Sequence, residues 1–118
     1  MTENKNILII DDEIDICKLI SGVLEDEGYI TFNAQNSDNA LAAISKNSID
    51  LIILDVWLEG SKLDGIELLQ EIHVSNPEIP IIIISGHGNI DTAVTAIKIG
   101  AYDYLEKPFK TERLMHTI

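Results

Sequence analysis

The sequence contains only one cysteine in 118 residues. A lone thiol can form neither an internal disulfide nor a cluster of thiolate metal ligands, so both are excluded. Cys17 lies among apolar residues at helical spacing. This setting favours a small buried hydrophobic side chain over a reactive thiol.

Basic residues are also scarce, with 8 Lys and Arg against 20 Asp and Glu and a formal net charge of −12. Because nucleic-acid backbones are polyanions, this balance opposes direct binding of nucleic acid. Apolar residues still make up 46% and charged residues 24% of the chain, which is ordinary globular composition. The length suits one compact domain and leaves no room for a second.

No charged N-terminal segment precedes a long apolar run, so the sequence predicts neither a signal peptide nor a membrane span. It also lacks repeats, low-complexity tracts and linkers rich in proline, glycine or serine. We therefore expect residues 1–118 to form a single cytoplasmic domain with no membrane partner.

Short apolar runs, mostly of β-branched residues, are what the sequence does contain. Residues 7–10, 51–54 and 81–84 are uninterrupted runs, typical of parallel strands that are covered on both faces. Residues 29–33 and 102–106 are weaker strand candidates, bounded by polar or turn-forming residues. The sequence thus predicts five strands.

Apolar residues at helical spacing lie between these strands. The predicted helices lie around residues 16–24, 40–44 with Ser37 as a candidate cap, 68–72, 93–101, and beyond Pro108 with Thr111 as a candidate cap. Strict alternation implies right-handed crossovers and a doubly wound α/β fold, a flavodoxin-like sandwich of five strand–helix units around a parallel sheet. The last helix has room for only about two turns. We therefore expect the chain to be the N-terminal fragment of a longer protein.

Polar residues occur at the carboxyl ends of the predicted strands, where open α/β sheets collect ligands. Asp11 and Asp12 follow the first strand, Asp55 closes the third, Ser85 follows the fourth and Lys107 follows the fifth. Three carboxylates brought together repel one another, and a hard divalent cation relieves this repulsion. Mg²⁺ is commonly held by one or two carboxylates together with phosphate oxygens. The sequence therefore predicts a magnesium site beside Asp55.

The same residues suit phosphoryl transfer, with Asp55 as the exposed nucleophile that forms an acyl phosphate. This chemistry needs the phosphoryl oxygens to be positioned and neutralised more than it needs proton transfer. Ser85 supplies a hydroxyl and Lys107 an ammonium group. Gly86 and Gly88 allow backbone N–H groups to approach an anion closely.

Each of these residues alone also has an ordinary explanation. The acidic triplet 11–13 could cap the following helix, Asp55 could form a turn, and Lys107 could be a solvated lysine. Independent capping and turn roles do not require acids, a hydroxyl and a lysine on converging strand ends. The combined set therefore favours the functional interpretation.

Taken together, these residues resemble the receiver-domain signature of two-component response regulators along the whole chain. The segments that carry the resemblance are Ile9-Ile10-Asp11-Asp12-Glu13, Leu54-Asp55, Asp64-Gly65, Ile84-Ser85-Gly86 and Lys107-Pro108-Phe109. The resemblance implies a sensor histidine kinase as phosphodonor, Asp55 as acceptor, and Mg²⁺ held by Asp11, Asp12, Asp55 and the backbone carbonyl of Trp57. It also implies that Ser85, Lys107 and the loop at Gly86 bind the phosphoryl oxygens, and that Tyr104 reorients on activation.

What the resemblance implies about activity is a signalling phosphoacceptor that assists its own phosphorylation and dephosphorylation, and not a turnover enzyme. The fourth helix, fifth strand and fifth helix would form a switch surface that pairs with a second copy or with an output module. A closer resemblance is to the NtrX-type nitrogen-regulatory group, in which an ATPase and a DNA-binding module follow the receiver. The segments that carry it are Trp57-Leu58-Glu59-Gly60-Ser61, Ser85-Gly86-His87-Gly88-Asn89 and Gly100-Ala101-Tyr102-Asp103. Transcriptional control would then belong to a portion outside this chain.

Three other functions fit the same fold class. A haloacid-dehalogenase-like phosphatase places its nucleophile in an Asp-x-Asp pattern after the first strand, which Asp11-Asp12-Glu13 does not match. A flavodoxin-like cofactor carrier needs a phosphate-binding loop there, and this loop is acidic and lacks Gly-x-Gly-x-x-Gly. The third alternative is an interaction domain that keeps the fold and never accepts phosphate.

One departure from many receivers is the segment from Asp55 to Gly65, which is longer and contains no proline.

Overall fold

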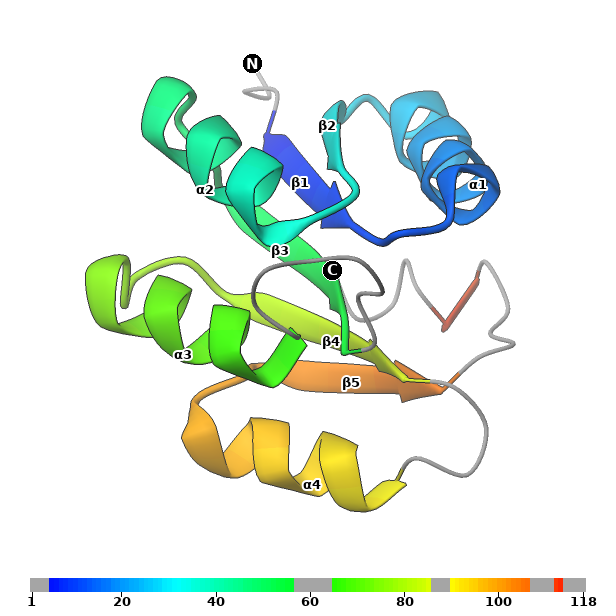
Figure 1. Ribbon diagram of the computed structural model, residues 1–118. Coiled ribbons are helices and arrows are strands. Elements are labelled where there is room, and N and C mark those ends of the chain that lie inside the picture. Colours follow the sequence, from blue (N-terminus) through cyan, green and yellow to red (C-terminus); the bar gives the residue numbers. More distant parts are fainter. Residues whose placement is uncertain (1–4, 57–64, 86–89, 107–111, 114–118) are drawn as a thin grey trace.

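The computed structural model describes residues 5–56, 65–85, 90–106 and 112–113 (Figure 1). Within these ranges strands and helices alternate along the chain. The strands are β1 (Asn6–Ile10), β2 (Ile30–Ala34), β3 (Leu51–Asp55), β4 (Ile81–Ser85) and β5 (Asp103–Glu106). The helices are α1 (Ile14–Asp26), α2 (Ser37–Lys46), α3 (Gly65–Ser75) and α4 (Ile90–Ile99).

The strands form one parallel sheet in the order β2-β1-β3-β4-β5. The chain therefore moves outward from β1 in both directions, which makes the gap between the carboxyl ends of β1 and β3 the topological switch point of the fold. This arrangement confirms the predicted doubly wound, flavodoxin-like class. It also identifies the place where a ligand is expected to bind.

Two apolar layers, one on each face of the sheet, bury its central strands. Leu8 and Ile10 of β1 pack in the layer that contains residues of α2, α3 and α4. Ile7 and Ile9 alternate with them and pack with residues of α1. Figure 1 shows α1 on one side of the sheet and α2 and α3 on the other. Each fully buried Ile or Leu stabilises the fold by about 1.5–3 kcal/mol, so this alternation holds the strand ends rigidly.

Several elements begin or end one residue away from the sequence-based expectation, and for two of them the structure shows the cause. The cap of α2 is Asn36, whose side chain accepts a hydrogen bond from the backbone N–H of Asn39 at 2.9 Å, and Ser37 is the first helical residue instead. The second strand begins at Ile30 and not at Tyr29, because the N–H of Tyr29 donates to the carbonyl of Leu24 and closes the end of α1. Both shifts arise from local hydrogen bonds that apolar periodicity does not report.

The predicted fifth helix lies mostly outside the described residues, as do Pro108 and Thr111, although Glu112 and Arg113 are helical. Its length and cap therefore stay predictions. In the part of the chain that the structure describes, no helix has both the length and the apolar character needed to cross a membrane.

Candidate functional site

Three carboxylates converge at the switch point between β1 and β3. One oxygen from each of Asp11, Asp12 and Asp55 lies within 4.8 Å of the other two. The sheet register produces this arrangement, because Ile10 pairs with Leu54 and the next residue of each strand is an aspartate. The sequence-based prediction that these three acids meet is confirmed.

The acid cluster is largely withdrawn from water. Asp11 is fully buried, Asp55 is 3% exposed and Asp12 is half-buried. The expectation that Asp55 is exposed is therefore wrong, because the residue ends a strand that is buried on both faces. Burying a carboxylate requires positive charge or hydrogen-bond donors nearby, and placing a second and third carboxylate beside it increases that requirement. An all-oxygen donor set of this kind matches the preference of Mg²⁺.

Backbone and side-chain contacts hold Asp11 in place. Its Oδ1 accepts the backbone N–H of Glu13 at 2.9 Å, and its own N–H donates to the carbonyl of Ala34 at 3.0 Å. The capping alternative for the acidic triplet is thus partly realised, but Glu13, the residue at the N-cap of α1, makes no capping hydrogen bond with its side chain. Asp11 therefore shapes the turn into α1 and supplies an acid to the cluster at the same time.

Cys17 contacts the backbone of Asp11, a contact that sequence reasoning missed. The thiol is buried, as predicted, and its Sγ donates to the backbone carbonyl of Asp11 at 3.5 Å. The Nε2 of Gln35 in turn donates to Cys17 Sγ at 3.8 Å. These weak hydrogen bonds link the turn after β2 to the turn that carries Asp11. Helical spacing predicted that Cys17 is buried, but it did not predict the contact with Asp11.

Ser85 closes β4 and is 1% exposed. Its Oγ makes no hydrogen bond within the part of the chain that the structure describes. A buried hydroxyl without a partner is unfavourable by about 1–3 kcal/mol, and such an atom is typical of a position that meets a ligand. Asp55 pairs with Ile84, so Ser85 stands one residue beyond the acceptor carboxylate on the neighbouring strand.

Tyr104 lies on the same face of the sheet as Ser85. It pairs with Ile83 of β4, and Ser85 follows Ile83 by two residues, so all three side chains point to the same layer. Tyr104 is half-buried and packs against the core of that layer. Trp57, Gly86 and Lys107 lie outside the described residues. Their predicted roles stay predictions.

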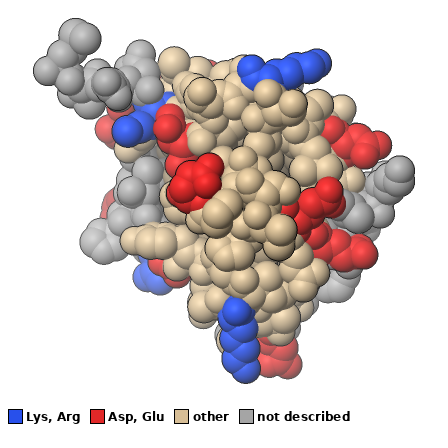
Figure 2. All heavy atoms as spheres, turned by 90° about the vertical axis from the view of Figure 1, so that its left-hand side faces the viewer, with Lys and Arg blue, Asp and Glu red and all other residues tan. Residues whose placement is uncertain are grey.

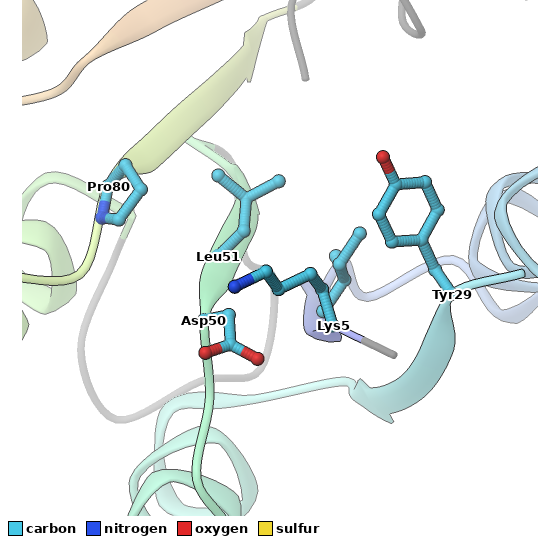
Figure 3. A pocket seen from close by; sticks show the side chains of 6 residues that line it. Lys5, Tyr29, Asp50, Leu51 and Pro80 are labelled. Atoms are coloured by element: carbon cyan, nitrogen blue, oxygen red, sulfur yellow. The ribbon is translucent and has the colours of Figure 1, made fainter. Parts of the chain in front are cut away.

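A hollow of about 350 Å³ lies at the opposite edge of the sheet, where the strands begin (Figure 3). It is lined by Lys5, Ile7, Tyr29, Asp50, Leu51 and Pro80. The Asp50 carboxylate beside it accepts the backbone N–H of Asn6 at 2.8 Å. A five-residue strand spans roughly 16 Å, so this hollow does not communicate with the acid cluster.

Comparison with known proteins decides between the families that share this fold. The sequence profile of the response regulator receiver domain matches residues 7–118. The chain belongs to this family. The acid cluster of the receiver stands at the sheet edge where the sequence predicted it, with Asp55 at the end of β3.

Several relatives of this receiver are NtrX proteins. The chain is 57% identical over 110 residues to the nitrogen assimilation regulatory protein NtrX of Azorhizobium caulinodans, covering 93% of this chain and 24% of the relative. The crystal structure of the NtrX receiver domain from Brucella abortus superposes with a TM-score of 0.92 at 55% identity, covering 93% of this chain and 92% of that one. NtrX from Brucella abortus in complex with ADP gives a TM-score of 0.94 at 54% identity, covering 97% of this chain and 26% of that one.

These comparisons confirm the predicted resemblance to the NtrX-type group. The chain spans about a quarter of the length of the curated relatives that it matches. The similarity therefore concerns the receiver domain. The activities of the other three quarters of each relative are properties of those relatives alone.

Proposed function

We propose that Asp55 accepts a phosphoryl group from a phosphorylated histidine of a sensor kinase, so that this receiver is the phosphoacceptor of a two-component system. The observation that carries the proposal is the convergence of Asp11, Asp12 and Asp55 within 4.8 Å at the switch point of the sheet. Asp55 ends a strand that is buried along most of its length, which fixes its backbone while leaving its carboxylate at the sheet edge.

Asp11, Asp12 and Asp55 would hold Mg²⁺, together with the backbone carbonyl of Trp57. When bound, the ion supplies positive charge that offsets the acids and the phosphoryl oxygens. Supporting this assignment are the all-oxygen donor set and the near-complete burial of two of the three acids.

In the proposed transfer, a carboxylate oxygen of Asp55 forms a bond to phosphorus as the bond from phosphorus to the kinase imidazole nitrogen breaks. The departing nitrogen keeps the electron pair of that bond. Ser85 donates its hydroxyl to one phosphoryl oxygen, and Lys107 pairs with another. Attack of water on the same phosphorus breaks its bond to the Asp55 oxygen, which restores the Asp55 carboxylate and releases inorganic phosphate. By orienting these groups, the receiver assists both its own phosphorylation and its own dephosphorylation.

The buried hydroxyl of Ser85, which has no partner among the residues that the structure describes, also supports a switching role. A shift of Ser85 toward phosphorylated Asp55 opens space on the face that it shares with Tyr104, and Tyr104 moves into that space. The surface of α4, β5 and the predicted fifth helix would then pair with a second copy or with an output module. Since the chain covers a quarter of its NtrX relatives, we propose that it is the N-terminal receiver of a cytoplasmic transcription regulator of nitrogen metabolism.

The test is to incubate the protein with acetyl phosphate, with and without Mg²⁺, and to weigh it by intact-protein mass spectrometry. We expect a gain of one phosphoryl group that requires Mg²⁺ and disappears in Asp55→Asn. Transfer from a purified histidine kinase that carries labelled phosphate would then test the donor. A protein that gains no mass under any of these conditions would be an interaction domain that does not use its acids. Sustained release of phosphate from simple phosphomonoesters would instead indicate a phosphatase.

A further inference from the structure

The chain leaves β3 through Val56, whose backbone is held from two directions. Its N–H donates to the carbonyl of Ile84 at 3.2 Å, which extends the β3–β4 pairing one residue beyond Asp55. Its carbonyl accepts the N–H of Gly65, the first residue of α3, at 3.1 Å. Val56 and Gly65 are therefore in direct contact although eight residues separate them in sequence.

Gly65 leaves no space for a side chain at this contact. A Cβ built on Gly65 would overlap the Cα and carbonyl oxygen of Val56 and would lie 2.6 Å from its carbonyl carbon. All three atoms belong to the backbone and cannot rotate away as the end of a flexible side chain could. A larger residue at position 65 would force α3 or the peptide after Asp55 to move.

Position 65 requires glycine because a side chain would not fit there, and not because of its backbone conformation. Among the described residues, only Gly28 and Gly100 have positive φ angles. Gly65 has a backbone that any residue can adopt, so alanine at this position would suffer only from the collision. The contact is also fixed from the side of the core, because Val56 is 3% exposed and packs in the layer that contains Leu68 and Leu69 of α3.

We infer that Gly65 is a positioning residue for the phosphoacceptor: it lets the start of α3 sit directly on the peptide that follows Asp55 and so fixes the direction of the acceptor carboxylate. The inference rests on the proposed function, since it assigns Gly65 a role in the same site. Asp55 is then fixed by the β-ladder before it and by the Val56–Gly65 contact after it.

A purely structural role for Gly65 makes a different prediction. If the contact only contributes packing, a Gly65→Ala protein is less stable, but its folded molecules bind Mg²⁺ and accept phosphate normally. If the contact positions Asp55, α3 shifts to relieve the collision, the fold persists, and the acceptor geometry changes. Metal affinity and phosphorylation rate then fall in molecules that are fully folded.

The experiment compares Gly65→Ala with two controls. Gly22→Ala makes the same change in α1, where a Cβ would meet no atom within 4 Å. Leu24→Ala removes a fully buried side chain of α1 from the opposite apolar layer and lowers stability without touching the Val56–Gly65 contact. For each protein, circular dichroism and thermal unfolding report folding, calorimetric titration gives the Mg²⁺ dissociation constant, and mass spectrometry gives the rate of acetyl phosphate transfer at saturating Mg²⁺.

We expect Gly65→Ala to keep the parent's circular dichroism spectrum, to bind Mg²⁺ about 10- to 100-fold more weakly, and to accept phosphate at least about tenfold more slowly, as is usual when groups that orient metal ligands are disturbed. Gly22→Ala and folded Leu24→Ala should stay within about twofold of the parent. A folded Gly65→Ala protein with parental affinity and rate overturns the inference. So does one that fails to fold at any temperature, because Gly65 would then be a folding requirement. If the parent itself accepts no phosphate, the proposed function fails instead.

Discussion

At the scale of single residues, Asp11, Asp55 and Ser85 stand out because they are polar and almost completely buried. Each closes or follows a strand made mostly of Ile and Leu, so the apolar sheet positions these groups at its edge. Burial of polar groups reduces stability unless they find partners. For Ser85, whose Oγ has no partner among the described residues, a bound ligand is the best explanation of this position.

Ser85 and Ser21 make a matched pair for testing this explanation. Ser85 Oγ has no partner in the described residues, whereas Ser21, which is also buried, donates its hydroxyl to Asn33 Oδ1 at 3.0 Å. We expect Ser21→Ala to lower the free energy of unfolding by about 1 kcal/mol, and Ser85→Ala to change it by less than about 0.5 kcal/mol.

The phosphorylation rate should respond in the opposite order. Ser85→Ala should slow acetyl phosphate transfer by about one to two orders of magnitude, because a donor to the phosphoryl oxygens is lost. Ser21→Ala should leave this rate unchanged. Urea unfolding and intact-mass kinetics measure the two quantities, and a large stability loss in Ser85→Ala would show that its hydroxyl has a structural partner.

At the scale of helices and strands, the sequence predicted the order and class of the elements well, because uninterrupted β-branched runs and helical spacing depend on burial. The convergence of Asp11, Asp12 and Asp55 was also predictable, since parallel strands bring their carboxyl ends to one edge. Exact ends were less predictable. Asn36 and Ser37 are both good caps, and only the hydrogen bond to Asn39 distinguishes them.

Contacts between distant segments were not predictable from periodicity at all. The close approach of Gly65 to Val56 depends on where α3 is seated against the sheet, and the sequence showed only an Asp-Gly pair. The hydrogen bond from Cys17 to Asp11 depends on how α1 turns after β1. Both are results of packing that local patterns do not encode.

The start of α2 offers a test of the corrected cap. Asn36→Ala removes the side-chain acceptor for the N–H of Asn39, and we expect it to lower the free energy of unfolding by about 1 kcal/mol. Asn39→Ala, at an exposed position in the same helix, should have no effect or a small stabilising one. Urea denaturation of both variants measures the difference. Equal effects would mean that the cap does not contribute.

The end of α4 is fixed by Gly100, where φ is +142° and a Cβ would lie 2.7 Å from the ring of His73. Gly100→Ala should therefore destabilise the fold by about 1–3 kcal/mol, through backbone strain and collision together. Adding His73→Ala removes the collision and leaves the strain, so the double variant should lose less than the sum of the single ones. Strict additivity in thermal unfolding would show that the His73 contact plays no part.

At the scale of the whole molecule, charge is the dominant property. The formal net charge is −12, and the surface in Figure 2 carries acidic side chains scattered over it with few basic ones between them. Mutual repulsion of this kind weakens a compact state and is partly screened by salt. A divalent cation bound at Asp11, Asp12 and Asp55 would oppose it at the point where the acids are closest together.

Mg²⁺ should therefore stabilise the folded protein by more than ionic strength alone. Binding to the native state adds RT ln(1 + [L]/Kd), which is about 2.7 kcal/mol at a concentration of 100 times Kd, and the thermal midpoint should rise accordingly. KCl at matched ionic strength separates this binding from screening. Asp11→Asn should abolish the extra rise, because the amide can still accept the N–H of Glu13 but brings no negative charge to the ion. Asp38→Asn, which removes the same charge from an exposed position in α2, should retain the full rise. A midpoint that follows ionic strength equally in all three proteins would mean that the acid cluster binds no metal.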